Sequence, residues 1–162
     1  MKTFAAIVLT TLAVIGIVLL VDKVEIPKTE DTIPAATGHV NDYAEIIGPE
    51  AEAALEADLK NFQPEIAVLT VKDMGGLSID EYSIKVAEAW KVGDADKDDG
   101  IILIVSTGDR KVRIEVGYGS EAKINDSKAG RILDESVVPN FKNSDWERGI
   151  LEGVAAIKGA LK

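Results

Sequence analysis

The stretch that most constrains the fold is residues 101–116, IILIVSTGDRKVRIEV, where an apolar run, a turn and an alternating segment follow one another. The unbroken run IILIV is typical of a strand that is buried on both faces of a sheet. The alternation in KVRIEV is typical of a strand with one covered face. With Gly108-Asp109 as a two-residue turn, the two strands form an antiparallel hairpin in which Gly100 faces Gly117. A central strand of this kind needs protein layers on both sides of its sheet.

The rest of the chain supplies one more strand and four helices. The strand is predicted at EIAVLTV, residues 65–71. The predicted helices begin at Pro49, at a Ser78–Glu81 capping box, at Ser127 and at a Ser144–Glu147 capping box. The third helix is expected to stop at Pro139, and apolar spacing places Trp90 and Trp146 in the core. The order α-β-α-β-β-α-α predicts an α/β fold, a small mixed sheet with helices on both faces.

The N-terminal region is expected to be an anchor and not part of the folded domain. Residues 4–21 carry no charge and, as a helix, would span about 27 Å, close to the thickness of a bilayer core. A cleaved signal peptide is the alternative, but no small-x-small site ends the run. We therefore divide the chain into a membrane anchor or signal segment at 1–21, an extended linker at 22–39 and one domain at 40–162.

Composition excludes several classes of function. The chain has 28 acidic and 18 basic residues, a net charge of −10, which disfavours binding to nucleic acid. It has no cysteine, so disulfides and thiol chemistry are excluded. Its one histidine, His39, is expected to be an exposed loop residue, which argues against a serine–histidine–carboxylate triad.

The segment GDADKDDG, residues 93–100, holds the most concentrated acidic cluster. Hairpin pairing brings Asp98 and Asp99 beside Gly117-Tyr118-Gly119, with Glu115 one step into the strand, and a short loop returns Asp126 to this edge. Carboxylates that meet in this way repel one another, and a hard cation with oxygen ligands relieves the repulsion. The segment fails the EF-hand pattern, because aspartate replaces its glycine and Val105 its final glutamate.

Each acidic residue also has a simpler interpretation. Asp94 and Asp96 are expected to be solvated turn residues. Asp126 is a candidate N-cap of its helix, and Glu115 a candidate exposed member of an alternating strand.

Several motifs together resemble a known family, the TPM domain. They are VNDYA at residues 40–44, GLSIDEY at 76–82, WKVG at 90–93, DGIIL at 99–103 and RKVRIEVGYG at 110–119. The resemblance extends over about residues 40–161.

The resemblance implies a Rossmann-like three-layer α/β sandwich, tethered to a membrane and exposed outside the cytoplasm, in some bacteria in the periplasm. Members include thylakoid-lumen proteins linked to photosystem repair and acid phosphatase activity, and an acetylcholine-receptor auxiliary subunit. Some bind calcium or another divalent cation at an acidic cluster. The positions that match are Asp42, Asp98, Asp99, Glu115 and Asp126.

We therefore expect a membrane-anchored accessory module of a membrane protein complex that binds a divalent cation, calcium or magnesium, through these five residues, with no catalytic residue assigned. The alternative is a metal-dependent acid phosphatase acting on phosphate esters, which needs cationic help from Lys97, Arg110 or Arg113. A third possibility is a structural subunit of a larger assembly or filament.

Overall fold

The structure, a computed structural model, describes residues 33–162. The anchor predicted at residues 1–21 and the first part of the linker predicted at 22–39 lie outside the described residues. Within residues 33–162, no helix is both long enough and apolar enough to cross a bilayer.

A four-stranded mixed sheet organises the described residues. Its strands, in the order in which they lie side by side, are β1 (Val40–Asp42), β2 (Ile66–Val71), β3 (Ile101–Ser106) and β4 (Lys111–Val116). The first three are parallel and β4 runs antiparallel to β3. This confirms the predicted small mixed sheet. Strand β1 was not predicted, because three residues are too few to establish an alternating pattern.

The β3–β4 hairpin has the predicted register. Ile101 pairs with Val116, and the Gly117 amide donates a 2.8 Å hydrogen bond to the Gly100 carbonyl. The strands end at the Ser106–Lys111 pair, so the turn comprises residues 107–110. Every residue of β3 is buried, as expected for a strand covered on both faces.

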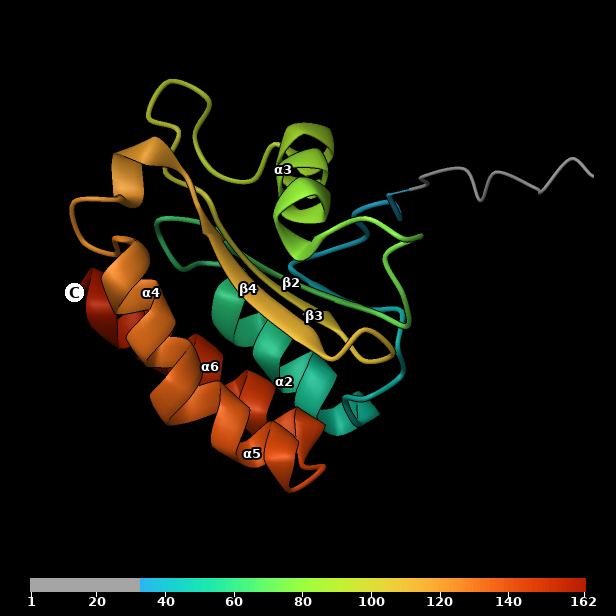
Figure 1. The fold of residues 1–162 in the computed structure, drawn as a ribbon. Helices are drawn as coiled ribbons and strands as arrows, with labels where there is room; N and C mark the ends of the chain where they lie inside the picture. The colour runs from blue at the N-terminus through green and yellow to red at the C-terminus, as the bar shows by residue number, and fades with distance from the viewer. Residues whose placement is uncertain (1–32) are drawn as a thin grey trace, which may run out of the picture. The chain divides into compact units, whose positions relative to one another are not determined.

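Helices cover both faces of the sheet (Figure 1). Helix α3 (Ile79–Trp90) packs on one face against Leu69, Ile102 and Ile104. The other face is covered by α2 (Pro49–Leu59), α4 (Asp126–Ile132), η2 (Leu133–Val137), α5 (Val138–Lys142) and α6 (Trp146–Leu161). The chain is therefore an α/β fold with a helical layer on each side of one mixed sheet.

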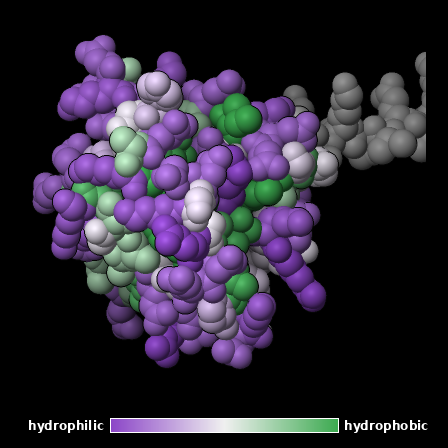
Figure 2. All heavy atoms as spheres, turned by 60° about the vertical axis from the view of Figure 1, so that its left-hand side comes forward, coloured by the Kyte–Doolittle hydropathy of each residue, from purple (hydrophilic) through white to green (hydrophobic). Residues whose placement is uncertain are grey.

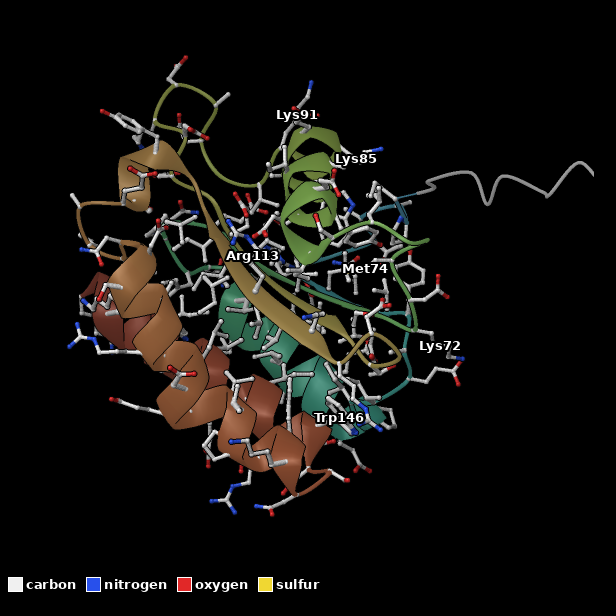
Figure 3. The ribbon with its side chains drawn as sticks, viewed as in Figure 1. Lys72, Met74, Lys85, Lys91, Arg113 and Trp146 are labelled. Carbon is white, nitrogen blue, oxygen red and sulfur yellow. The ribbon has the colours of Figure 1, made fainter. Side chains whose placement is uncertain are left out.

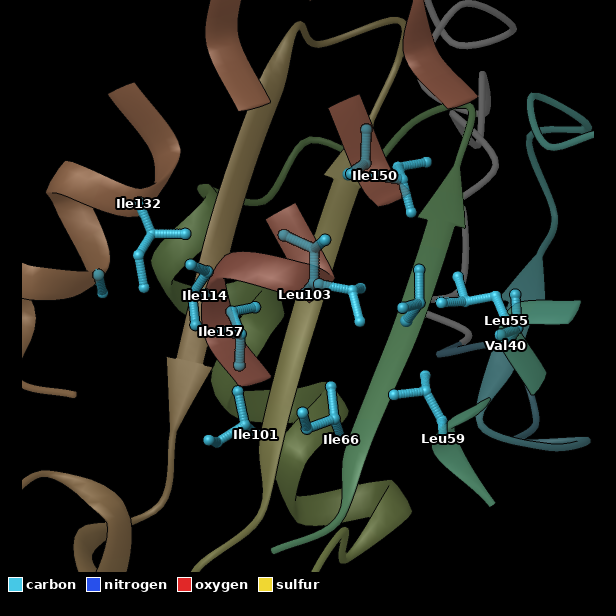
Figure 4. Close-up of a cluster of buried hydrophobic side chains, with 14 of the residues drawn as sticks. Val40, Leu55, Leu59, Ile66, Ile101, Leu103, Ile114, Ile132, Ile150 and Ile157 are labelled. Carbon is cyan, nitrogen blue, oxygen red and sulfur yellow. The ribbon is translucent and has the colours of Figure 1, made fainter. Parts of the chain in front are cut away.

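The larger core lies between the sheet and the α2–α6 layer (Figure 4). Leu103 of β3, Ile66 of β2 and Ile150 of α6 are all fully buried there. Each such side chain contributes about 1.5–3 kcal/mol relative to its exposed state, so this contact dominates the stability of the fold. Both tryptophans pack against a core cluster, as predicted, although each is only partly buried.

Of the two predicted capping boxes, one is present in the structure and the other is not. The Ser78–Glu81 capping box is confirmed, since each residue's backbone N–H donates to the other's side chain. The second predicted capping box is wrong, because Asp145 caps α6 by accepting from the Arg148 N–H. The Glu147 carboxylate instead accepts a 2.7 Å hydrogen bond from the Gly48 N–H, a contact between α6 and the start of α2.

The helix predicted to stop at Pro139 continues through it. A π-helical segment, η2, joins α4 to α5, and Pro139 occupies the first turn of α5. The π turn accommodates the proline: the Val138 N–H bonds to the Leu133 carbonyl, five residues back, and the next residue, Pro139, has no N–H to place in this altered ladder. The N-cap of α4 is Asn125, whose side chain accepts from the Lys128 N–H, and Asp126 is the first helical residue.

His39 is not the exposed loop residue that was predicted. Its side chain is only 22% exposed, and Nδ1 lies 2.8 Å from Oε1 of Glu56 on α2. The Val40 N–H also donates to the Glu56 carboxylate, over 2.8 Å. Burial raises the pKa of Glu56, but the hydrogen bonds from His39 and Val40 outweigh it and hold the pKa below its usual 4.5. This carboxylate ties the start of the sheet to α2.

Candidate functional site

The acidic loop lies against the chain that follows β4, as the hairpin register predicted. The Gly119 N–H donates to the Asp98 carbonyl over 2.8 Å, and the Tyr118 N–H donates to the Asp98 carboxylate over 3.2 Å. Both glycines of the Gly117-Tyr118-Gly119 segment are needed for this approach. A Cβ at Gly117 would overlap the Asp98 carbonyl, and one at Gly119 would overlap the Lys97 carbonyl.

A cleft of about 490 Å³ opens between the last turns of α3, the acidic loop and the end of β4. We call it the acidic cleft, because five carboxylate side chains line it: Glu88, Asp94, Asp98, Glu115 and Glu121. Lys91, at the end of α3, supplies its one basic side chain (Figure 3). Two of its apolar lining side chains are strongly exposed, Ile84 at 50% and Tyr118 at 78%. The cleft therefore combines a negative lining with accessible apolar surface.

Glu115 is already engaged by a cation of the protein. Its carboxylate accepts a 2.8 Å hydrogen bond from Arg113 Nε and a 2.7 Å hydrogen bond from the Ser83 hydroxyl of α3. Arg113 also contacts Asp80 of α3, at 2.7 Å, and Figure 3 places it between β4 and that helix. Burial lowers the pKa of Arg113, but these carboxylates outweigh burial and raise the pKa above its ordinary value. Arg113 and Glu115 thus fasten α3 to β4.

The other carboxylates of the acidic loop shape the loop itself. Asp94 accepts from the Asp96 and Lys97 amides and lies 3.4 Å from the Lys97 amine, and these contacts lower its pKa. Asp99, half-buried, accepts a 3.0 Å hydrogen bond from the Asp94 N–H. Asp94 and Asp96 are exposed, as predicted.

Asp42 lies at the opposite end of the sheet from the acidic loop. It ends β1 opposite Thr70, which pairs with Val105 near the hairpin turn, whereas Asp98 precedes the first residue of β3. Its carboxylate accepts from the Ile46 and Ile47 amides, at 3.2 and 2.8 Å, and from the Thr70 hydroxyl. Asp42 therefore organises the turn after β1, and the expectation that it joins the acidic loop is wrong.

The five predicted metal ligands do not form one cluster. Asp98 and Glu115 line the acidic cleft and Asp99 lies in the adjoining loop, while Asp126 is exposed at the start of α4 and Asp42 is remote. Over residues 33–162, no three or more histidine, aspartate or glutamate side chains are grouped so that they could hold a metal ion. The predicted set therefore does not fit a single ion.

Two carboxylates of the cleft were missed by the sequence reasoning. Glu88 lies one turn after Ile84 on α3, and Glu121 follows the glycine-containing segment. Helical spacing could have placed Glu88 beside Ile84 on one face, but only the packing of α3 beside β4 brings that face to the cleft.

The family model of the TPM domain matches residues 40–160. This chain belongs to the TPM domain family. A comparison with curated proteins gave no match.

Solved structures share the fold of this TPM domain. The N-terminal domain of a protein from P. gingivalis has a TM-score of 0.70 at 28% identity, over 77% of this chain and 82% of that one. The BA42 protein from Bizionia argentinensis has a TM-score of 0.63 at 19% identity, over 72% and 82%. The N-terminal domain of cg2496 from Corynebacterium glutamicum has a TM-score of 0.60 at 13% identity, over 82% and 85%. The latter two similarities concern the fold alone.

Proposed function

We propose that this TPM domain is a non-catalytic accessory module of a membrane protein assembly, and that its acidic cleft binds a divalent cation, calcium in preference to magnesium. One observation carries the proposal: five carboxylates and a single amine line the cleft. A lining of this charge attracts cations and concentrates them at the surface.

The cation that suits this cleft is a hard one that tolerates irregular ligands. In the described part of the chain, no basic side chain forms an ion pair with Glu88, Asp98 or Glu121, so these three carboxylates are available. Calcium accepts carboxylates and waters in flexible geometry, whereas magnesium demands a near-ideal octahedron. Because the ligands are exposed and not assembled beforehand, we expect an affinity of about 0.1–1 mM, typical of extracellular calcium modules.

Calcium titration of the full-length chain, followed by amide NMR, tests the proposal. We expect saturable shifts in residues 93–100 and 117–121, and about fivefold weaker binding in Asp98→Asn. Asp134→Asn is the matched control, because Asp134 is exposed on η2 and its substitution changes the net charge by the same amount. No saturable shift at about 10 mM calcium, or equal effects of the two substitutions, would refute cation binding at this cleft.

The phosphatase alternative has weaker support. Arg113 is held by Glu115 and Asp80, and Lys97 is paired with Asp94. Arg110 lies in the hairpin turn, at the other end of the strands from the acidic loop. A phosphoryl group entering the acidic cleft would meet Lys91 as its one lining cation among five carboxylates. Release of phosphate from a model ester, lost in Asp98→Asn and retained in Asp134→Asn, would favour catalysis over binding.

We also propose that residues 4–21 anchor the chain in a membrane, with the domain outside the cytoplasm. The uncharged length of this stretch and the membership in the TPM family support the proposal. Protease digestion of sealed membranes from producing cells, read with an antibody to the domain, tests the orientation. Native mass spectrometry after detergent extraction distinguishes a lone protomer from an accessory subunit or a larger structural assembly.

A further inference from the structure

A second pocket, of about 440 Å³, lies at the turn end of the β3–β4 hairpin, away from the acidic cleft. The start of β4 forms one side of it, and α5 and the start of α6 form the other. We call it the basic pocket, because its charged lining residues are Arg110, Lys111 and Lys142, with no carboxylate among them. In a chain with a net charge of −10, this local reversal of charge marks a distinct surface.

The hydrogen-bond donors of the basic pocket are free. Within residues 33–162, Arg110, Lys111 and Lys142 form no ion pair or side-chain hydrogen bond, and the Trp146 indole N–H has no acceptor in the protein. Arg110 is held in the left-handed region at φ 54°, which fixes the direction in which the turn presents it. Guanidinium, ammonium and indole groups all donate and do not accept, so the Ser144 hydroxyl is the one side-chain acceptor among the lining residues.

Apart from Ser144, the remaining lining is apolar and partly aromatic. Phe141 and Trp146 pack in a tilted arrangement, with ring centroids 4.6 Å apart and an interplanar angle of 47°. Val112 and Val138 complete this surface, and all four side chains are only partly buried. Figure 3 shows Trp146 in the α5–α6 region, remote from Lys91 at the acidic cleft. A ligand that accepts hydrogen bonds from the basic side chains would therefore also contact the rings of Phe141 and Trp146.

We propose that the basic pocket binds a small aromatic carboxylate. The cavity volume falls within the range of small-molecule sites, which are mostly apolar with a few convergent polar groups. A carboxylate can take two parallel hydrogen bonds from Arg110 and further ones from the lysines. The net charge of −10 on the chain repels a polyanion over a Debye length of about 8–10 Å, but a single small anion is affected much less. On the face of the molecule drawn in Figure 2, hydrophilic side chains predominate, with smaller hydrophobic areas between them.

Titration of the full-length chain with phenylacetate tests this site. The readout is the Trp146 indole cross-peak in a ¹H–¹⁵N spectrum. Trp90 is an internal reference, because it packs on the other face of the sheet and its indole N–H donates to the Pro34 carbonyl over 2.8 Å. We expect a saturable shift of the Trp146 peak and of the Lys111 amide, with Trp90 unmoved. Acetate, which lacks the ring, and benzyl alcohol, which lacks the charge, are expected to bind about tenfold more weakly.

Matched charge variants separate the pocket from the overall charge of the chain. Lys142→Glu is expected to weaken phenylacetate binding about tenfold. Lys60→Glu, an exposed position after α2, changes the net charge equally and is expected to leave it unchanged. The stability of both variants to urea is measured alongside, so that loss of fold is not mistaken for loss of binding.

Three results would overturn the proposal: no saturable shift at about 20 mM phenylacetate, equal weakening by the two variants, or acetate binding as tightly as phenylacetate. Sedimentation velocity gives a further outcome. A dimer that Lys142→Glu dissociates and Lys60→Glu does not would assign the pocket to a second copy of the chain, and would also overturn the small-ligand proposal.

Discussion

Asp42 offers the sharpest test of the distinction between a metal ligand and a structural carboxylate. In the structure it accepts hydrogen bonds from two consecutive amides, of Ile46 and Ile47, and from the Thr70 hydroxyl. The Thr70 oxygen in turn accepts from the Ala44 N–H over 3.0 Å. Replacement of Asp42 therefore removes the acceptor that organises the turn between β1 and α2.

The size of the effect follows from these bonds. Hydrogen bonds to a charged acceptor contribute about 1.5–3 kcal/mol each, and a buried donor left without a partner costs about 1–3 kcal/mol. Ile47 is buried, whereas Ile46 is partly exposed and water can replace one bond there. For Asp42→Ala we expect the free energy of unfolding to fall by about 3 kcal/mol. For Asp42→Asn, which keeps one acceptor but turns an NH₂ toward an amide donor, we expect about 2 kcal/mol.

Urea unfolding of both variants, with and without calcium, measures this loss. Asp134→Asn is the control for the change in charge and is expected to stay within about 0.5 kcal/mol of the wild type. A cost below about 0.5 kcal/mol for Asp42→Asn would refute the structural role. A weakening of calcium binding equal to that in Asp98→Asn would return Asp42 to the metal site and refute the placement of the two residues at opposite ends of the sheet.

Three further predictions concern the framework. The pKa of Glu56 in the folded state lies below 4.5, so its contribution to the free energy of unfolding is present above that pH and is lost as pH falls through the lower folded value. The difference in stability between wild type and Glu56→Gln, measured by urea unfolding, should therefore shrink below pH 4.5. Gly119→Ala should expose the acidic loop to amide hydrogen exchange and cost about 1–3 kcal/mol in urea unfolding, because the new Cβ overlaps the Lys97 carbonyl; unchanged exchange would contradict the contact. Leu103→Ala should cost about 2–5 kcal/mol, measured by urea unfolding, and a cost below about 1 kcal/mol would contradict its full burial in the central strand.

Local features of the fold could be predicted because their physics is local. The β3–β4 register follows from the turn residues and the alternation beside them, and the cap of α3 follows from Ser78 and Glu81 three residues apart. Where two local signals compete, the prediction failed. Ser144 and Asp145 both have side chains that can cap a helix. In the structure Ser144 has a left-handed backbone, at φ 61°, and the N-cap is Asp145, one residue later than predicted.

The candidate sites show the same division. Sequence alone placed Asp98 beside Gly117-Tyr118-Gly119, because a hairpin joins residues close in the chain. It could not place Asp42, since that requires knowing that β1 exists and runs parallel to β2. In parallel strands the C-terminal ends lie side by side. Asp42, at the end of β1, therefore lies at the opposite end of the sheet from the start of β3.

Periodicity, turn chemistry and adjacent motifs were enough to predict the α/β class, the central buried strand, the hairpin and the TPM family. Which charges share a surface depends on tertiary packing instead. Glu88 joins Asp98 and Glu121 only because α3 packs beside the end of β4, and Lys142 joins Arg110 only because α5 packs beside its start. Side chains far apart in sequence meet through the packing of apolar faces, and that packing sets the charge of both pockets without being encoded by any local pattern of charge.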